Sequence, residues 1–370
     1  MKILVLADCQ SCFLSHTILT GLWEMDDVEV YEMPILQSVR GRSDCGYDLP
    51  GNPGGGMTGC TGYLQPAPLP EQTHTEEEIL TLGERHFDLI VAVSQRDYVR
   101  RALNTLTTNR WKISSKLVVA DGEDSEYIDR EFLRKWEPKI LFKREMTRNY
   151  SIPSYWSSYE RPVMPLQFGA FLRSIPSIND EEKILDFFVS LGRTNPIRDK
   201  FLAACLDAVY GHKVCPPDMA WIATNDNSPL CTEHRYGKHL YNLTNWNDYM
   251  VLQGGAKIGA SVIGFGRDCL HAWELFSQAT LALYQDPGLH IPHPFKDGIH
   301  CYQIFPDGFS VLDKIIRPMI EHYDEYVHIA RAGKAHCRKY HSTRARAEYL
   351  VDISMKVLGG EKIDLSKYGL

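Results

Sequence analysis

The feature of this sequence that most restricts its fold is the alternation of short apolar runs with longer amphipathic segments in the first 165 residues. Such alternation is typical of βαβ units, because parallel strands need long connections that usually contain a helix. We therefore expect a parallel α/β sheet in this part of the chain. The predicted strands are 2–7, 28–33, 89–93, 117–120 and 140–143, and the predicted helices are 15–24, 75–84, 98–105 and 129–135.

A second alternating unit follows a segment with several prolines at 160–180. Its most informative part is 261–308, in which an apolar strand runs into the turn Gly264-Phe265-Gly266, a helix from about Asp268 and another apolar strand at 280–284. The 370 residues exceed the usual size of one hydrophobic core, so two domains are expected. The further predicted elements are strands at 187–191, near 213–215 and at 257–263, helices at 197–210 and 246–254, and a helical tail over 315–357.

Composition is that of an ordinary globular protein, with 44% hydrophobic and 24% charged residues. The formal net charge of −7 provides no overall positive field for binding nucleic acid. The apolar run before Asp8 is too short for a signal peptide, and no apolar stretch approaches the ~20 residues that span a bilayer. Ten cysteines lack the spacing of a disulfide framework, so we expect reduced thiols and a cytoplasmic location.

One acidic residue stands out in the helix of the 261–308 segment. Glu274 is flanked by Trp273, Leu275 and Phe276, so its carboxyl group is expected to be buried. Burying a carboxylate is costly unless it has a hydrogen-bonding partner. The two hydroxyls of a nucleotide ribose would be suitable partners. The glycines at 264 and 266 allow a backbone to approach such a ligand closely.

A second glycine turn, Gly192-Arg193, lies between a predicted strand and a predicted helix. Arg193 and Arg198 can each donate several hydrogen bonds to phosphate oxygens, and the start of the helix adds a partial positive charge. Together these groups suit a diphosphate. The alternative is a solvated arginine at the start of a helix.

The order of elements in 261–308, ending in Asp297-Gly298-Ile299-His300, resembles the donor half of GT-B-type glycosyltransferases, and most of all the bacterial spore-maturation-like group. The runs 141–145 and 165–169 resemble that group as well. The resemblance implies an α/β fold of two Rossmann-like domains facing across a cleft, with a C-terminal helix that crosses back to the N-terminal domain. It implies an acceptor domain at 1–165 with a long loop at 37–72, a nucleotide-sugar domain at 180–345, and a crossing helix and tail at 346–370.

The implied function is transfer of a sugar from a nucleotide-sugar donor to a hydroxyl acceptor. Glu274 would hold the ribose, and Arg193 would contact the diphosphate together with Arg198 or His271. No cofactor and no essential metal are expected, because cations and helix dipoles neutralise the leaving group. Many relatives carry two glutamates here, and Gly266 stands in the place of the first. The alternative for His271 is a core histidine.

On the acceptor side, the resemblance implies a catalytic base in the loop after the first strand, where His16 lies. A neutral imidazole can accept the proton of the attacking hydroxyl, and Asp121, Glu123 or Asp124 would orient it. Two alternatives stay open: His16 caps the first helix, and Asp121 binds the acceptor sugar. A base at His16 implies inversion, whereas the likeness of the Glu274 segment to retaining members implies retention.

Several other signals have competing interpretations. Cys9 and Cys12 form a C-x-x-C pair of redox type, which the length and the second domain make a poor fit. The histidines at 290, 293 and 300 could bind a metal, but contacts to sugar or phosphate suit loop histidines better. Loop 37–72 is either a lid over the acceptor or a mobile insertion. Lys143 and Arg144 either face the cleft or pair with Glu145 or Glu131.

Rival functions also remain open at this stage. A nucleotide-sugar epimerase or hydrolase could use the same fold without an acceptor. A nucleotide- or glycan-binding protein without catalysis would explain the missing first glutamate. A transferase acting on modified DNA is a further alternative, although the negative net charge disfavours it.

Overall fold

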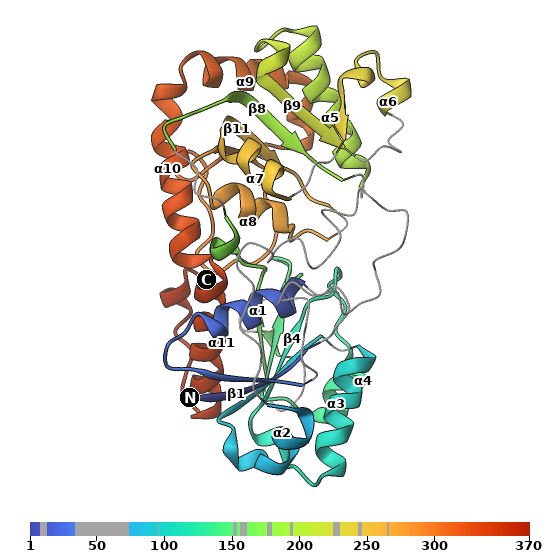
Figure 1. The fold of residues 1–370 in the computed structure, drawn as a ribbon, viewed down its shortest axis with the longest axis vertical. Helices are drawn as coiled ribbons and strands as arrows, with labels where there is room; N and C mark the ends of the chain where they lie inside the picture. Colours follow the sequence, from blue (N-terminus) through green and yellow to red (C-terminus); the bar gives the residue numbers. More distant parts are fainter. Residues whose placement is uncertain are drawn as a thin grey trace.

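The computed structural model describes residues 1–7, 13–33, 74–94, 96–150, 154–155, 161–175, 180–192, 195–224, 230–242, 246–264 and 266–370. The chain forms two α/β domains, each built on its own sheet, which lie one above the other along the long axis of the molecule (Figure 1). Among the described residues, no helix combines the length and the apolar composition that crossing a bilayer requires.

The N-terminal domain contains a seven-stranded sheet with the order β2-β1-β3-β4-β5-β7-β6. Neighbouring strands are parallel except for β6 and β7. Strands β3, β4 and β5 are buried along their whole length, as continuous apolar runs are when helices cover both faces of a sheet. The strands are β1 (Lys2–Leu6), β2 (Glu29–Glu32), β3 (Leu89–Val93), β4 (Leu117–Asp121), β5 (Ile140–Lys143), β6 (Ser154–Tyr155) and β7 (Pro162–Pro165).

The helices of this domain begin within two residues of the predicted positions. At the start of α2, the Thr75 hydroxyl accepts a hydrogen bond from the Glu78 amide, and the Glu78 carboxylate accepts one from the Thr75 amide. This reciprocal capping box satisfies two amides that the helix cannot satisfy itself. The helices are α1 (Phe13–Trp23), α2 (Glu76–Leu82), α3 (Asp97–Thr108) and α4 (Arg130–Trp136).

The C-terminal domain contains a six-stranded sheet with the order β10-β9-β8-β11-β12-β13, and its strand pairs are parallel. The strands are β8 (Leu185–Ser190), β9 (Ala220–Thr224), β10 (Tyr241–Asn242), β11 (Ala256–Ser261), β12 (Leu281–Tyr284) and β13 (Tyr302–Gln303). The helices of this domain are α5 (Pro196–Leu206), α6 (Leu230–Glu233), α7 (Trp246–Gly254), α8 (Leu270–Phe276), α9 (Leu312–Glu321) and α10 (Tyr323–Tyr340). Helix α11 (Thr343–Leu358) follows and packs on the N-terminal domain.

The strand predicted near 213–215 is wrong. Helix α5 continues as a π-helical turn at Asp207–Gly211, and Lys213 then adopts a positive φ of 53°. Pro216 and Pro217 follow, and proline cannot donate to a strand ladder. The chain therefore enters the sheet only after the prolines, as β9.

The last helices tie the two domains together. Helices α10 and α11 run as one column beside both domains (Figure 1). Helix α11 packs on α1, where Gly21 is required because a Cβ there would collide with the Thr343 backbone. Arg346 of α11 donates to the Phe168 carbonyl (3.1 Å) and lies over the Trp273 ring. The crossing helix thus contacts the N-terminal domain, as the resemblance implies.

Each sheet has a point where its strand order reverses. From β1 the chain places β2 on one side and β3 on the other, and from β8 it places β9 on one side and β11 on the other. Ligands of open α/β sheets bind beyond the carboxyl ends of the strands at such points. The loops after β8 and β11 are therefore the first place to look for a site.

Candidate functional site

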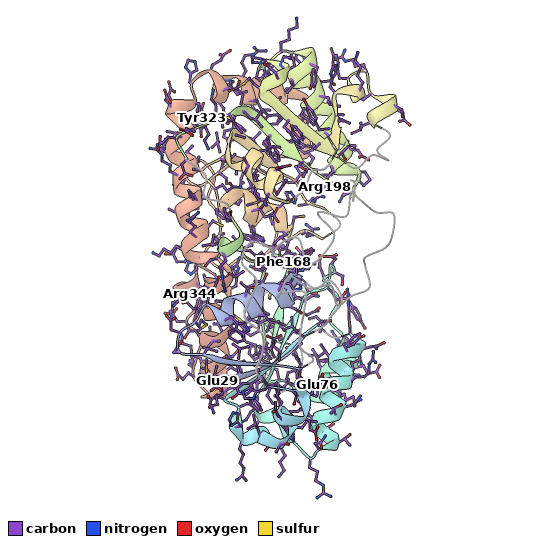
Figure 2. The ribbon with its side chains drawn as sticks, in the orientation of Figure 1. Glu29, Glu76, Phe168, Arg198, Tyr323 and Arg344 are labelled. Atoms are coloured by element: carbon purple, nitrogen blue, oxygen red, sulfur yellow. The ribbon has the colours of Figure 1, made fainter. Side chains whose placement is uncertain are left out.

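Arg198 links the two loops that meet at the reversal point of the second sheet. It lies in the first turn of α5, is 6% exposed, and is on the side of its domain that faces the N-terminal domain (Figure 2). Its guanidinium donates to the carbonyls of Gly192 (2.9 Å), after β8, and Ile263 (3.2 Å), after β11. No carboxylate in the described part of the chain pairs with it. Nη2 also donates to the Val262 carbonyl and to Sγ of Cys269, each at 3.4 Å, so the guanidinium has hydrogen-bond partners within the protein but no carboxylate against its charge.

The glycine turn after β11 is shaped around this arginine. A Cβ on Gly264 would lie 2.7 Å from Nη2 of Arg198, so a larger residue would require the guanidinium to shift from its present position. The amide of Gly264 donates to the Gly266 carbonyl (3.1 Å), and its carbonyl accepts from Nδ2 of Asn195 (3.0 Å). In this structure Gly264 thus seats Arg198 and leaves no free amide for a ligand.

The start of α5 is already capped within the protein. The Asn195 side chain accepts from the Ile197 amide (3.0 Å), the Asn195 carbonyl accepts from the Arg198 amide (2.9 Å), and Pro196 has no amide hydrogen. The helix start therefore contributes a partial positive charge rather than free donors. Arg193, the other expected diphosphate contact, lies outside the described residues.

His271 lies one turn before Glu274 on α8. Its Nε2 is 2.8 Å from the Ser261 hydroxyl at the end of β11. Burial, with a smaller contribution from the neighbouring Arg198 charge, lowers the pKa of His271 well below its ordinary value. The imidazole is therefore neutral at pH 7. It can hydrogen-bond to a phosphate oxygen but does not add positive charge.

Glu274 is buried, as its apolar neighbours in the sequence predict, with 3% of its surface exposed. The Tyr249 hydroxyl of α7 donates to Oε2 at 2.8 Å, whereas Oε1 has no hydrogen-bond partner in the part of the chain that the structure describes. Burial raises the pKa of Glu274 to about 8. The carboxyl group is therefore mostly protonated at pH 7 and has one oxygen open to a ligand.

Gly266 marks a close approach of the two domains. A Cβ there would lie 2.5 Å from Oδ1 of Asp124 and 3.1 Å from Oε1 of Glu145. Two carboxylates of the N-terminal domain thus lie against the position where the resembled family often has its first glutamate. A larger side chain at 266 would require these carboxylates to move.

The contact continues into the start of α8. Both Glu145 oxygens accept backbone hydrogen bonds at 3.0 Å, from the amides of Arg267 and Asp268. Arg144 donates to the Asp268 carbonyl (2.8 Å) and pairs with Glu145 (3.3 Å), one of the partners predicted for it. The Asp268 carboxylate accepts from the Phe168 amide (2.8 Å). Burial raises the pKa of Asp268 to about 6, although Arg144 opposes the shift.

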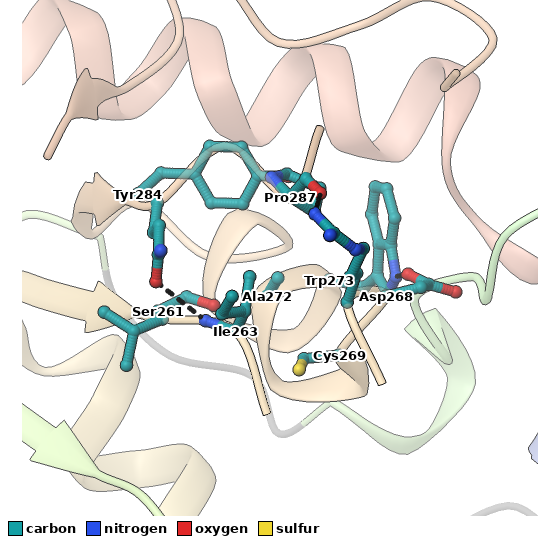
Figure 3. A pocket seen from close by; sticks show the side chains of 11 residues that line it. Ser261, Ile263, Asp268, Cys269, Ala272, Trp273, Tyr284 and Pro287 are labelled. Carbon is teal, nitrogen blue, oxygen red and sulfur yellow. Dashed lines mark hydrogen bonds between the residues drawn. The ribbon is translucent and has the colours of Figure 1, made fainter. Parts of the chain in front are cut away.

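A narrow pocket lies beside this contact, at the carboxyl ends of β11 and β12 (Figure 3). The indole of Trp273 donates to Asp268 at 2.8 Å on one side of it, and Ser261 and Tyr284 lie on the other (Figure 3). Its volume of about 10 Å³ has room for about one water molecule. A nucleotide sugar does not fit there without movement.

On the acceptor side, His16 lies in α1 and is 1% exposed. Burial lowers its pKa to about 4, so the imidazole is neutral at pH 7. Among the described contacts, the three carboxylates expected to orient it bond to cations instead. The pairs are Asp121 with Lys143, Glu123 with Arg96, and Asp124 with Arg144.

Asp121 forms a buried ion pair at the end of β4. Its Oδ2 accepts from Nζ of Lys143 (2.7 Å), and its Oδ1 accepts from the Glu123 amide (3.0 Å). Both charged side chains are at most 2% exposed. The pair thus holds the carboxyl ends of β4 and β5 together. Lys143 was expected to face the cleft or pair with Glu145 or Glu131, and its partner is Asp121.

Sequence reasoning missed Ser94, at the reversal point of the first sheet. It is buried at the end of β3 with a positive φ of 83°, and its hydroxyl accepts from the Arg96 amide (3.1 Å). A non-glycine residue rarely adopts this conformation, and such strain concentrates at functional sites. No sequence signal marks it, because its backbone angle depends on the neighbouring β4.

The loop histidines contact protein groups. His290 bonds to the Tyr150 carbonyl (2.8 Å), His300 stacks on His336, and His293 stacks on Tyr340. Within the described residues, no group of three or more histidine, cysteine or acidic side chains is arranged to hold a metal. Cys9, Cys12 and loop 37–72 lie outside the described residues.

The comparisons with known proteins give structural matches. The sequence matches no protein-family model and no curated protein. A glycosyltransferase of Rickettsia africae ESF-5 has a TM-score of 0.61 at 10% identity, covering 96% of this chain and 98% of the other. Anabaena HepE in complex with UDP-glucose has a TM-score of 0.55 at 13% identity, covering 96% and 100%. Sucrose-phosphate synthase of Thermosynechococcus elongatus has a TM-score of 0.54 at 10% identity, covering 98% and 100%.

These likenesses extend over nearly the whole chain, and at such low identity they concern the fold. They agree with the two parallel sheets and the reversal points described above. The predicted α/β architecture of two Rossmann-like domains is confirmed. This chain has the fold of the GT-B-type glycosyltransferases.

Proposed function

We propose that this chain is a glycosyltransferase, related to the spore-maturation-like group, that moves a sugar from a nucleotide sugar to a hydroxyl acceptor without an essential metal. The observation that supports it best concerns Arg198 and Glu274. A buried cation without a carboxylate partner and a buried acid with an open oxygen lie beside the same reversal point. The fold it shares with nucleotide-sugar-dependent proteins supports this reading.

The spacing of these groups suits a nucleoside diphosphate. His271 and Glu274 are one helical turn apart, about 5 Å along the axis, and His271 lies next to Arg198. We assign the ribose to Glu274 and the diphosphate to Arg198, His271 and Arg193. The leaving diphosphate gains negative charge during transfer, and a buried guanidinium stabilises that charge more strongly than an exposed one.

We assign the acceptor to the N-terminal domain, residues 1–165, and the donor to residues 180–345, with 346–370 as the crossing segment. The carboxyl ends of both sheets meet where Glu145 reaches the start of α8, so an acceptor near His16 and a donor near Arg198 approach from opposite domains. His16 is neutral at pH 7 and serves as the proton acceptor. Asp121, the other residue predicted on the acceptor side, is paired with Lys143.

The test is a panel of nucleotide sugars, with thermal unfolding and nucleotide release as readouts. A donor at 100 times its Kd adds about 2.7 kcal/mol of stability and raises the Tm by several degrees. Release that depends on an added glycan indicates transfer, and release without one indicates hydrolysis. Turnover in excess chelator tests the metal independence. If no nucleotide sugar raises the Tm, the proposed function is wrong.

A further inference from the structure

A chain of buried polar side chains ends on the open acid described above. It begins at Gln278, just after α8, whose Nε2 donates to Oε1 of Gln253 at 3.0 Å. Nε2 of Gln253 donates to the Tyr249 hydroxyl at 2.9 Å, and that hydroxyl donates to Oε2 of Glu274 at 2.8 Å. All four residues are at most 3% exposed. Hydrogen bonds between buried polar groups are stronger than in water, because the local dielectric constant is low.

The direction of this chain follows from the chemistry of its members. The amide nitrogen of Gln253 can only donate, so the Tyr249 oxygen must accept from it. When Glu274 is ionised, its carboxylate can only accept, so the Tyr249 hydroxyl donates to Oε2. Oε1 is then the oxygen left for other donors.

The open oxygen is the second, independent observation. Oε1 of Glu274 has no partner among the described residues, although it is buried. A buried oxygen without a partner is costly, so a ligand that supplies hydrogen bonds gains affinity there. Ribose hydroxyls are donors that a carboxylate accepts well and a protonated acid accepts poorly.

We propose that Tyr249 is a positioning residue for nucleoside binding: supported by Gln253 and Gln278, it holds Oε2 of Glu274, leaves Oε1 to the ribose, and thereby couples ribose binding to release of the Glu274 proton to solvent. This inference rests on the proposed function. The tyrosine does not touch the ligand and acts through Glu274.

The surroundings of Glu274 are consistent with this coupling. Helix α8 packs against α7, α10, β11 and β12. Burial raises the pKa of Glu274 to about 8, and the Tyr249 hydrogen bond opposes that shift. No charged side chain among the described residues bonds to the carboxyl group. The titratable or charged groups of these elements that contact α8 or the residue after it are Tyr249 of α7, Tyr284 of β12, and Cys337 and Arg338 of α10. On α8 itself, His271 bonds to Ser261 of β11.

The test measures how affinity depends on pH. The probe is UDP-glucose, or ADP-glucose or GDP-mannose if either binds more tightly, because their diphosphates do not titrate near neutrality. Calorimetry is run from pH 6 to 9.5 in two buffers of different ionisation enthalpy. For wild type we expect about one proton released per probe bound at pH 7. We also expect about tenfold tighter binding at pH 9 than at pH 7, levelling off above pH 8.

Tyr249→Phe keeps the ring that packs on Phe188 and removes the hydroxyl. Because the ionised Glu274 loses a hydrogen bond, the pH above which probe affinity stops rising increases by about one to two units. The affinity for the probe at pH 7 falls by about tenfold or more. Gln253→Leu is expected to shift the profile in the same direction by less. It provides a second reading if Tyr249→Phe does not fold. Tyr349→Phe removes a buried hydroxyl without a described partner on α11, which packs on α1, and should leave the profile unchanged.

Each outcome bears on a distinct claim. If the wild type binds none of the probes, the proposed function is refuted and this inference falls with it. If the wild type binds with an affinity that does not change with pH, or if Tyr249→Phe has the wild-type profile, the positioning role is refuted while the proposed function stands. A shifted profile in both α7 variants and an unchanged one in Tyr349→Phe supports the role.

Discussion

The burial of Glu274 predicts that the free energy of unfolding falls as the pH rises, while the ionised form that binds a ribose becomes more populated. Its pKa is raised from an ordinary value of 4.5 to about 8, so between these pH values the folded protein holds a proton that the unfolded chain has lost. The stability that this proton provides is complete below pH 4.5 and is lost as the pH rises through 8. From pH 5.5 to pH 7.5 the loss amounts to about 2.5 kcal/mol.

Glu274→Gln isolates this effect, because the amide has nearly the same shape and does not titrate. Its carbonyl can still accept the Tyr249 hydroxyl hydrogen bond. Contributions from all other groups cancel when the variant and the wild type are compared at the same pH. We therefore expect the free energy of unfolding of the variant, relative to the wild type, to rise by about 2.5 kcal/mol between pH 5.5 and pH 7.5. The variant should bind nucleotide sugars more weakly.

The assay is urea unfolding at the two pH values, with Glu126→Gln, an exposed acid, as the matched control. The control should show a difference near zero at both pH values. A relative stability of Glu274→Gln that is the same at pH 5.5 and pH 7.5 would refute the reasoning, because Glu274 would then be ionised in the folded protein.

Three further substitutions test the site and one tests the contact between the domains. Arg198→Met should weaken nucleotide-sugar binding by at least tenfold in calorimetry, whereas Arg235→Met, on an exposed arginine paired with Asp207, should not. Gly264→Ala should displace the Arg198 guanidinium and lower the free energy of thermal unfolding by about 1–3 kcal/mol. Unchanged nucleotide-sugar binding would contradict the close contact between Gly264 and this guanidinium. His16→Gln should keep donor affinity and lower transfer by about 10²–10⁴-fold, so full turnover would end its role as base. Arg144→Met should cost about 3–5 kcal/mol by leaving buried acids unpaired, and a loss below 1 kcal/mol in urea unfolding would show that the contact is weak.

Local patterns predicted most of the fold because burial on both faces makes a strand continuously apolar. Strands β3, β4 and β5 begin at the predicted residues, and the capping box at Thr75 begins α2. The short strands β10 and β13 have two residues each, too few for any periodicity. Strand β9 was displaced because the end of α5 and two prolines decide where the chain can rejoin the sheet.

The site was predictable only where a residue's own neighbours reveal its environment. The apolar residues beside Glu274 predicted a buried acid, and in the structure Glu274 is buried with one oxygen that has no described partner. The partners of Arg198 were not predictable, since Ile263 lies far along the chain and hydrogen-bonds through its backbone, which has no side-chain signature. The carboxylates expected to orient His16 pair with cations of neighbouring elements, contacts that no local pattern in the sequence reveals.

By itself, the sequence determined the βαβ alternation, the two sheets and the burial of Glu274, because these depend on which nearby residues are apolar. Only the tertiary structure decided that Gly264 lies against the guanidinium of Arg198, and that Tyr249 bonds to one oxygen of Glu274 while the other has no described partner. It also decided that Glu145 of one domain accepts from the two amides just before the N-cap of α8 in the other. Each of these depends on atoms brought together by sheet topology. The physical reason is that hydrogen bonds and close contacts act over about 3 Å, whatever the separation in sequence.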